Sequence, residues 1–339
     1  MSAARATRLV LRRARGLLAL AVGLVAGVTL APVGPGRAAE VQWRPAGEVG
    51  LAATVSSHSP HRLVLDSRVE VAGGSGPVGW HLAAAPTLPV TVSKGGEAQV
   101  GDVDWAVEEA TLSWQRGAWT TSVGRERLPL EAARLLLPFA IEPVSPSGLR
   151  LGVWGARVAW AEGLTRLRLA VVEDVRQEGR ATPVVSVRRQ GASMEVEGHV
   201  AWIDEDGSPA TGVTASGLLG DLVVYGELWH APGWRYVVGV SGFWGEALWT
   251  VEAGRAALLP GQGVRRVAAA QLSWQQGPDV AWTLGSRVSF DDDAVRGQLD
   301  VERATLAARH DWRLFASVRV GPGEPSWALG AACRYYWGL

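Results

Sequence analysis

The last stretch of the chain, residues 326–339, reads SWALGAACRYYWGL and decides the fold. Its odd positions, from Trp327 to Leu339, are apolar or aromatic, whereas Arg334 and two glycines stand at even positions. A repeat of two is the side-chain period of a β-strand. Large apolar groups on one face and small or charged groups on the other suit a strand whose apolar face meets lipid. We interpret it as the closing strand of a membrane β-barrel; an edge strand of a soluble β-sandwich is the alternative.

This stretch resembles the final strand of outer-membrane barrel proteins, which alternates apolar residues and ends on an aromatic one. Tyr335 and Trp337 fit the pattern, and the terminal Leu339 departs from the usual Phe or Trp. The resemblance implies the outer membrane of a diderm bacterium as the location. It also implies outer-membrane lipid and the barrel-assembly machinery as partners. Cys333 is the one cysteine, which excludes an internal disulfide; on the apolar face we predict that it is a small hydrophobic residue.

The first 38 residues predict a secretory signal peptide. Five arginines precede an apolar run over 16–31, small residues follow at Ala38 and Ala39, and no acidic residue comes before Glu40. Cleavage after Ala38 would remove six arginines, leaving 27 basic and 33 acidic residues and a net charge of −6. Such a chain is a poor nucleic-acid binder. We expect residues 39–339 to form a single transmembrane barrel domain.

Alternation of apolar and polar residues recurs from end to end of the remaining chain. It predicts an all-β, antiparallel up-and-down transmembrane barrel of about 18 strands, with 16 as the alternative. The expected strands are 46–56, 61–72, 78–85, 104–116, 118–126, 148–161, 164–174, 182–189, 191–203, 210–219, 221–230, 234–244, 246–254, 264–275, 279–290, 294–308, 312–320 and 326–339. Tight turns such as 116–117, 162–163, 220–221 and 245–246 alternate with longer connections, including 86–103, 127–147 and 255–263. With an even count, both ends of the barrel chain fall on the side of the tight turns.

Tryptophan placement favours a membrane barrel over a soluble sandwich. The chain has 17 Trp but only four Phe and four Tyr, and many Trp flank short turns, as in the pairs 114 and 119, 229 and 234, 244 and 249, and 274 and 282. Indole prefers the boundary between membrane and water, and aromatic girdles mark both rims of membrane barrels. A Trp-rich carbohydrate-binding sandwich is the main competitor.

Residues 109–160 resemble a segment of porin-like outer-membrane families, including the alginate-export and phosphate-selective porins. In those families a hairpin ends in a Gly-Arg-Gln-Arg-like run, then Trp-Gly and a loop with prolines. Gly124-Arg125-Glu126-Arg127 matches the run, and Pro138, Pro143 and Pro146 lie in the loop, whereas Leu130-Glu131 replaces Trp-Gly. The resemblance implies a porin-like barrel without naming a solute.

The loop over 127–147 is strongly apolar for an exposed segment. We therefore expect it to fold into the barrel and narrow it, with Arg127, Glu131 and Arg134 at the constriction and a short helix over 131–137. Packing on the outer rim or on a neighbouring subunit is the other interpretation, and a homo-oligomer stays open.

Signatures of catalysis, of a metal site and of a cofactor are missing from the sequence. The functional candidates are charged residues on the polar face of strands, where a water-filled lumen would hydrate them. These pore-lining candidates are Arg62, Asp66, Arg68, Glu70, Arg166, Arg168, Glu195, Glu197, His199, Arg287, Arg313, Arg319 and Arg334. The sequence predicts a porin-like channel for small hydrophilic solutes or ions. The alternatives are an outer-membrane enzyme acting on lipid or lipopolysaccharide, and a secreted β-sandwich binding module.

Overall fold

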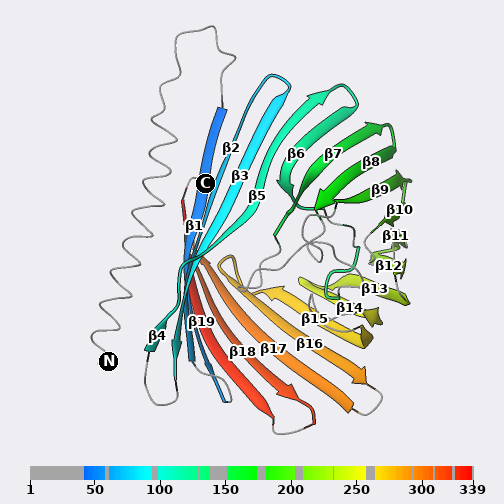
Figure 1. Cartoon of the computed structure of the whole chain (residues 1–339). Coiled ribbons are helices and arrows are strands. Elements are labelled where there is room, and N and C mark those ends of the chain that lie inside the picture. Colours follow the sequence, from blue (N-terminus) through cyan, green and yellow to red (C-terminus); the bar gives the residue numbers. More distant parts are fainter. Residues whose placement is uncertain are drawn as a thin grey trace, which may run out of the picture.

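In the computed structural model the chain is an antiparallel β-sheet that wraps round an interior (Figure 1). The structure describes residues 42–57, 61–93, 98–128, 130, 132–136, 151–173, 181–202, 209–231, 233–256, 264–291, 294–307, 310–322 and 325–337. The predicted signal peptide lies outside these residues. Within the described ranges, no helix is both long enough and apolar enough to cross a bilayer.

The strands follow one another along the chain. The first half comprises β1 (Gln42–Ser56), β2 (His61–Ser75), β3 (Val78–Val92), β4 (Ala98–Val100), β5 (Asp104–Arg116), β6 (Trp119–Glu126), β7 (Val153–Glu162), β8 (Thr165–Glu173), β9 (Ala181–Gln190) and β10 (Met194–Ala201). The second half comprises β11 (Ala210–Leu219), β12 (Leu222–His230), β13 (Trp234–Trp244), β14 (Ala247–Ala256), β15 (Arg265–Gln275), β16 (Val280–Asp291), β17 (Ala294–Ala307), β18 (His310–Val320) and β19 (Ser326–Trp337).

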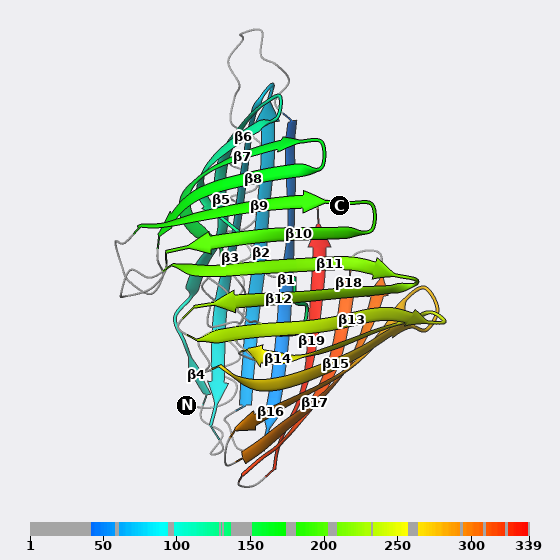
Figure 2. The ribbon, with the colours of Figure 1, turned by 90° about the vertical axis from the view of Figure 1, so that its right-hand side faces the viewer.

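Strand pairing closes the sheet into a barrel. β1 pairs antiparallel with both β2 and β19, with Gly47 opposite Trp337 on one side and Val69 on the other. β4 and β5 pair with successive parts of β3: β5 with the first part and β4 with the last. The two strands therefore occupy one position in the barrel. The result is a closed antiparallel barrel of 18 strands. Figure 2 shows β8–β14 crossing in front of β1–β3 and β19, with the interior between them.

The predicted strands are confirmed to within a few residues, with two differences. The connection expected over 86–103 is largely strand, because β3 continues to Val92 and pairs with β4. The strand expected from residue 148 begins at Val153. The tight turns carry glycine with positive φ, as at Gly117 and Gly245 (both 58°), a conformation that favours glycine in two-residue hairpins.

The outer surface carries aromatic residues near both ends of single strands. On β5, Trp105 and Trp114 are both exposed and stand nine residues apart, which is about 30 Å along an extended strand. On β19, Trp327 and Tyr335 are exposed with Leu329 between them. A tilted strand of this length matches an apolar band flanked by two aromatic girdles. Cys333 of β19 is a free thiol of intermediate exposure.

Trp229 departs from the predicted rim position. Its side chain is fully buried and its ring stacks on His199, with centroids 5.2 Å apart. A Cβ on Gly212 would lie 2.4 Å from this indole, so the missing side chain makes room for the ring against the neighbouring strand. Trp229 therefore belongs to the barrel interior.

Candidate functional site

The segment after β6 enters the space enclosed by the strands (Figure 1). Its Leu128 and Leu130 are buried in a cluster with Val153 of β7 and Trp229 of β12. Small apolar residues on β8–β11, and one directly after β12, complete this cluster: Ala170, Val172, Val184, Ala201, Ala210 and Ala231. Burial of this apolar area fixes the first part of the segment against the inner wall of the barrel.

A second cluster fixes the next part of the segment. Leu136 is fully buried against Val237 of β13, Ala256 of β14, and Val267 and Ala269 of β15. Ala133 and Leu135 pack on the same cluster. The apolar residues of the segment that the structure describes therefore pack on the inner wall. We call the inward faces of β7–β15, with residues 128–136 packed on them, the covered wall.

Glu252 of β14 binds the segment through its backbone. The carboxylate is completely buried and accepts hydrogen bonds from the N–H groups of Arg134 (2.6 Å), Leu135 (3.0 Å) and Leu136 (2.8 Å). The Tyr225 hydroxyl donates a fourth bond, at 2.7 Å. Successive backbone N–H groups form a concave anion site, and hydrogen bonds to an ionised acceptor are strong.

Glu227 of β12 binds the segment in the same way. One of its oxygens accepts hydrogen bonds from the backbone N–H groups of Ala132 and Ala133. The other accepts a bond from the Trp229 indole at 3.3 Å. The two carboxylates thus hold residues 132–136, and the expected helix over 131–137 is wrong for these residues, because their N–H groups are bonded to the wall.

Arg134, one of the predicted constriction residues, lies over this wall. Its guanidinium stands 5.1 Å from the centre of the Tyr225 ring and donates to the Ser241 hydroxyl at 3.1 Å. A Cβ on Gly239 would meet the Tyr225 ring at 2.4 Å, so the ring lies flat against the neighbouring strand. Glu131 lies outside the described residues.

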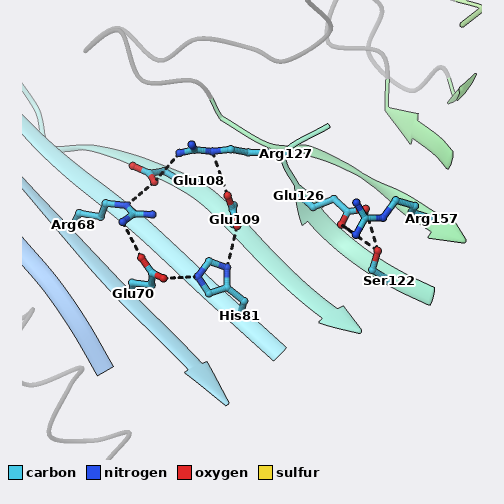
Figure 3. Close-up of polar contacts among 9 residues, drawn as sticks. All are labelled: Arg68, Glu70, His81, Glu108, Glu109, Ser122, Glu126, Arg127 and Arg157. Carbon is cyan, nitrogen blue, oxygen red and sulfur yellow. Dashed lines mark hydrogen bonds and ion pairs between the residues drawn. The ribbon is translucent and has the colours of Figure 1, made fainter. Parts of the chain in front are cut away.

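Arg127, at the start of the segment, belongs to a closed ring of arginine, glutamate and histidine side chains (Figure 3). It contacts Glu108 at 3.5 Å and Glu109 at 3.2 Å. Arg68 contacts Glu108 at 2.7 Å and Glu70 at 2.8 Å. The ring is closed by His81, which lies 3.0 Å from both Glu70 and Glu109. The predicted residues Arg68, Glu70 and Arg127 therefore meet in one network.

A β-bulge explains how two adjacent carboxylates reach this ring. Glu109 pairs with Ala83 of β3, while the next pair joins Ala84 to Val107, so Glu108 is an extra residue in β5. A bulge breaks the alternation and re-aims a side chain. A strict period of two would have placed Glu108 and Glu109 on opposite faces, which is why the sequence did not predict this pair.

A second group of predicted residues meets on β8–β10. Arg168 is buried and lies 3.7 Å from Glu197, which in turn lies 3.8 Å from His199. Arg188 pairs with Glu195. Arg166 stands directly opposite Arg188 in the strand register.

Four of the remaining predicted residues lie on the other side of the barrel, on the inward faces of β16–β19 and β1, which we call the open wall. Arg313 contacts Asp311 at 2.7 Å and Glu302 at 3.6 Å. Arg319 donates to Gln298 at 3.1 Å, and Arg334 lies 3.7 Å from Glu48. Each pair joins neighbouring residues or strands of the wall. Arg313, Glu302 and Arg334 are partly exposed, whereas Asp311 is 1% exposed.

Arg287 borders a recess of about 330 Å³ between the open wall and the segment. Leu135 and Phe315 supply apolar surface there, and Asp300 and Glu302 supply carboxylates. Phe315 lies over Gly330, where a Cβ would come within 2.1 Å of the ring. The side chains of Arg62 and Asp66 lie outside the described part of the structure. No set of three or more His, Cys, Asp or Glu residues that could hold a metal occurs in the ranges the structure describes.

Sequence reasoning missed several interior residues, above all Glu227 and Glu252. On β12 the inward positions are Val223, Tyr225, Glu227 and Trp229, so both faces of the strand are apolar and the alternation is weak. The sequence did contain one signal that could have found them. A strand with two apolar faces needs an apolar segment to cover its inward face, and the segment over 128–136 is apolar.

A closed barrel of 18 strands, an apolar band between aromatic girdles and an inward-folded loop together define a porin-type membrane barrel. Comparison with protein-family models gives no match, and comparison with curated proteins gives none either.

Among solved structures, Pseudomonas aeruginosa OpdK with vanillate is similar, with a TM-score of 0.65 and 11% identity over 87% of this chain and 98% of OpdK. Acinetobacter baumannii OccAB4 has a TM-score of 0.63 and 9% identity, over 89% of this chain and 99% of its own. Pseudomonas aeruginosa OccD3 (OpdP) has a TM-score of 0.63 and 8% identity, over 88% and 93%. At these identities the likeness establishes the shared fold.

Proposed function

We propose that this chain is an outer-membrane channel through which small hydrophilic solutes or ions diffuse passively. The observation that carries the proposal is the attachment of residues 128–136 to the covered wall. Five consecutive backbone N–H groups, from residues 132–136, bind two carboxylates of the wall. A loop held in this way narrows the lumen without a moving part. The barrels of similar fold include OpdK, an outer-membrane protein.

Selection would rest on size and on a weak electrostatic field. The pore-lining candidates carry both signs, and most described ones contact an opposite charge or a polar side chain, as Arg313 contacts Asp311. A channel of mixed charge tunes ion preference without excluding either sign. Arg127 and Arg134 would supply positive charge at the constriction, together with Glu131 as a carboxylate.

One comparison narrows the range of candidate solutes. OpdK was crystallised with vanillate, a small aromatic carboxylate. The recess beside Arg287 and Phe315 has room for a molecule of that size and offers a cation beside an aromatic ring. Vanillate is therefore the first organic solute to test, and the resemblance of residues 109–160 to alginate-export and phosphate-selective porins remains a second guide.

The same proposal assigns the remaining segments of the chain. Residues 1–38 would direct export and be removed after Ala38, residues 39–339 would form the single barrel domain, and the final strand would be read by the assembly machinery of a diderm bacterium. The N-terminal residue of the mature protein, determined by sequencing, tests the cleavage site.

The enzyme alternative gains no support from the outward-facing histidines that the structure describes. His230 packs edge-on against the Trp234 ring, with centroids 4.9 Å apart. His310 lies 5.1 Å from the Tyr335 ring. Both imidazoles therefore contact aromatic residues at the rim, which suits an interfacial position more than catalysis.

Single-channel recording of the purified barrel in planar bilayers tests the proposed function. Insertion should give discrete conductance steps, and vanillate added on one side should interrupt the current. A variant lacking residues 138–147 should give larger steps, because that part of the predicted constriction is shortened. A heat-modifiable barrel that inserts and never conducts would contradict the proposal.

A further inference from the structure

Four side chains form a row across adjacent strands on the outer surface of the barrel. The register places Tyr236 of β13 opposite Arg255 of β14, Arg255 opposite Arg266 of β15, and Arg266 opposite Phe290 of β16. Two arginines therefore stand side by side, with an aromatic residue on each flank.

Alternation along each strand places this row on the outside. Each row member has a direct neighbour on its own strand that points the other way: Val237 beside Tyr236, Ala256 beside Arg255, Val267 beside Arg266 and Ser289 beside Phe290. All of these are buried on the inner side. Tyr236 and Phe290 are 44% and 47% exposed, and both arginines are exposed. The row faces away from the lumen and takes no part in the proposed conduction path.

Two like charges directly opposite each other destabilise a sheet unless something neutralises them. Within the described residues, neither Arg255 nor Arg266 has an ion-pair partner, and the connection over 257–263 contains no charged residue. Other outward arginines are better accommodated. Arg125 donates to the Gly152 carbonyl at 2.8 Å, and Arg303 lies over the Trp282 ring at 5.6 Å.

The row lies at one particular end of the barrel. The β13–β14 hairpin turns at Gly245, close to Trp244 and Ala247, whereas Tyr236 and Arg255 are at the far end of the same pair. That end carries the longer connections, which in outer-membrane barrels face the outside. The row therefore stands at the outer-leaflet interface, provided that the proposed outer-membrane location is correct.

We propose that Arg255 and Arg266 form a binding site for a phosphate group of an outer-leaflet lipid, the phosphorylated glycolipid lipid A. Guanidinium groups bind phosphate oxygens in a two-pronged geometry, and two of them side by side match a doubly charged anion. Tyr236 and Phe290 would flank the boundary between the sugar and the acyl chains, the level at which aromatic side chains settle in a membrane. Bound phosphate would relieve the repulsion between the arginines.

Native mass spectrometry of the full barrel in detergent tests this proposal. The probes are bis-phosphorylated lipid A and the same lipid after removal of its phosphates. The test variant is R255Q/R266Q, and the matched control is R303Q, which removes an outward arginine at the other rim. Two arginines near an anionic headgroup contribute about 2 kcal/mol, so the double variant should bind lipid A about 30-fold more weakly.

The expected pattern is selective. R303Q should bind as the wild type does, R255K/R266K should retain part of the affinity, and the phosphate-free lipid should bind equally weakly to all variants. Inorganic phosphate at millimolar concentration should not displace lipid A. Equal binding of lipid A by the wild type and the double variant would overturn the proposal, as would displacement by inorganic phosphate alone.

Conductance of the same preparations separates this proposal from the proposed function. The double variant should form heat-modifiable barrels with unchanged conductance steps, because both arginines lie outside the lumen. If the wild type binds lipid A, the double variant does not, and neither protein conducts, the lipid site is supported and the channel is refuted. If the barrel conducts but binds lipid A equally well with and without its phosphates, the channel is supported and the phosphate site is refuted.

Discussion

The covered wall and the open wall use charge in opposite ways. On the covered wall Glu252 is completely buried and Glu227 is 4% exposed, and backbone N–H groups of residues 132–136 satisfy both. On the open wall Glu302 and Arg313 are 40% and 39% exposed and contact each other at 3.6 Å. The loop backbone therefore holds the two buried carboxylates of the covered wall, whereas Glu302 and Arg313 of the open wall stay partly exposed.

Replacing Glu252 by Ala should change the attachment of the loop more than any other substitution considered. The change removes three hydrogen bonds from the loop backbone to the carboxylate and one from Tyr225 of the wall, and the three loop bonds contribute at least about 3 kcal/mol to the attachment of the loop. That corresponds to an increase of about 150-fold in the released fraction of the loop. We expect larger and noisier conductance steps in planar bilayers, together with protease cleavage within 127–147.

Glu302→Ala is the matched control, because it removes a carboxylate of the open wall whose described partner is Arg313. It should leave the loop protected from protease. Equal protection in both variants would mean that the buried carboxylate is not the anchor of the loop.

The ring at the start of the loop should give an intermediate effect. Glu108 is 1% exposed and contacts both Arg68 and Arg127, whose side chains are 32% and 44% exposed. Because the partners are partly hydrated, Glu108→Gln should destabilise the barrel by about 1–2 kcal/mol. The midpoint of heat-induced unfolding on gels should fall, and conductance should fluctuate more as Arg127 loses a partner.

Glu70→Gln is the control within the same ring. Its carboxylate is 33% exposed, so water can replace the lost contact with Arg68 and the midpoint should change less. A larger loss for Glu70→Gln than for Glu108→Gln would show that burial does not set the strength of the ring.

The two walls also differ in how far the sequence predicted them. Where the inward side chains are partly or fully exposed, as at Arg313 and Arg319, polar residues alternate with outward-facing apolar ones, so a period of two marks the strand and the direction of each side chain. This is why the strand bounds followed from the sequence. Under the loop the interior is apolar, as at Tyr225 and Trp229, and the alternation fades.

Two further features of the site could not be predicted from the pattern of residues along a single strand. The bulge at Glu108 depends on the register between β3 and β5, which a single strand does not encode. The binding of Glu252 to Leu136 joins residues 116 positions apart, and backbone N–H groups leave no residue-type signal at all. The apolar composition of the loop did predict that it folds inward, because its leucines have to be buried against another surface.

Arg287→Gln should have the smallest effect on stability and a clear effect on selectivity. Arg287 borders the recess of the open wall and has no hydrogen-bond or ion-pair partner among the described residues, so stability should change by no more than about 0.5 kcal/mol. Removing a positive charge from the lumen should shift the reversal potential in a salt gradient towards cation preference. Arg303→Gln, which removes an outward charge, should leave the reversal potential unchanged. An identical shift in both variants would mean that the potential reflects the net charge of the barrel and that Arg287 does not face the conduction path.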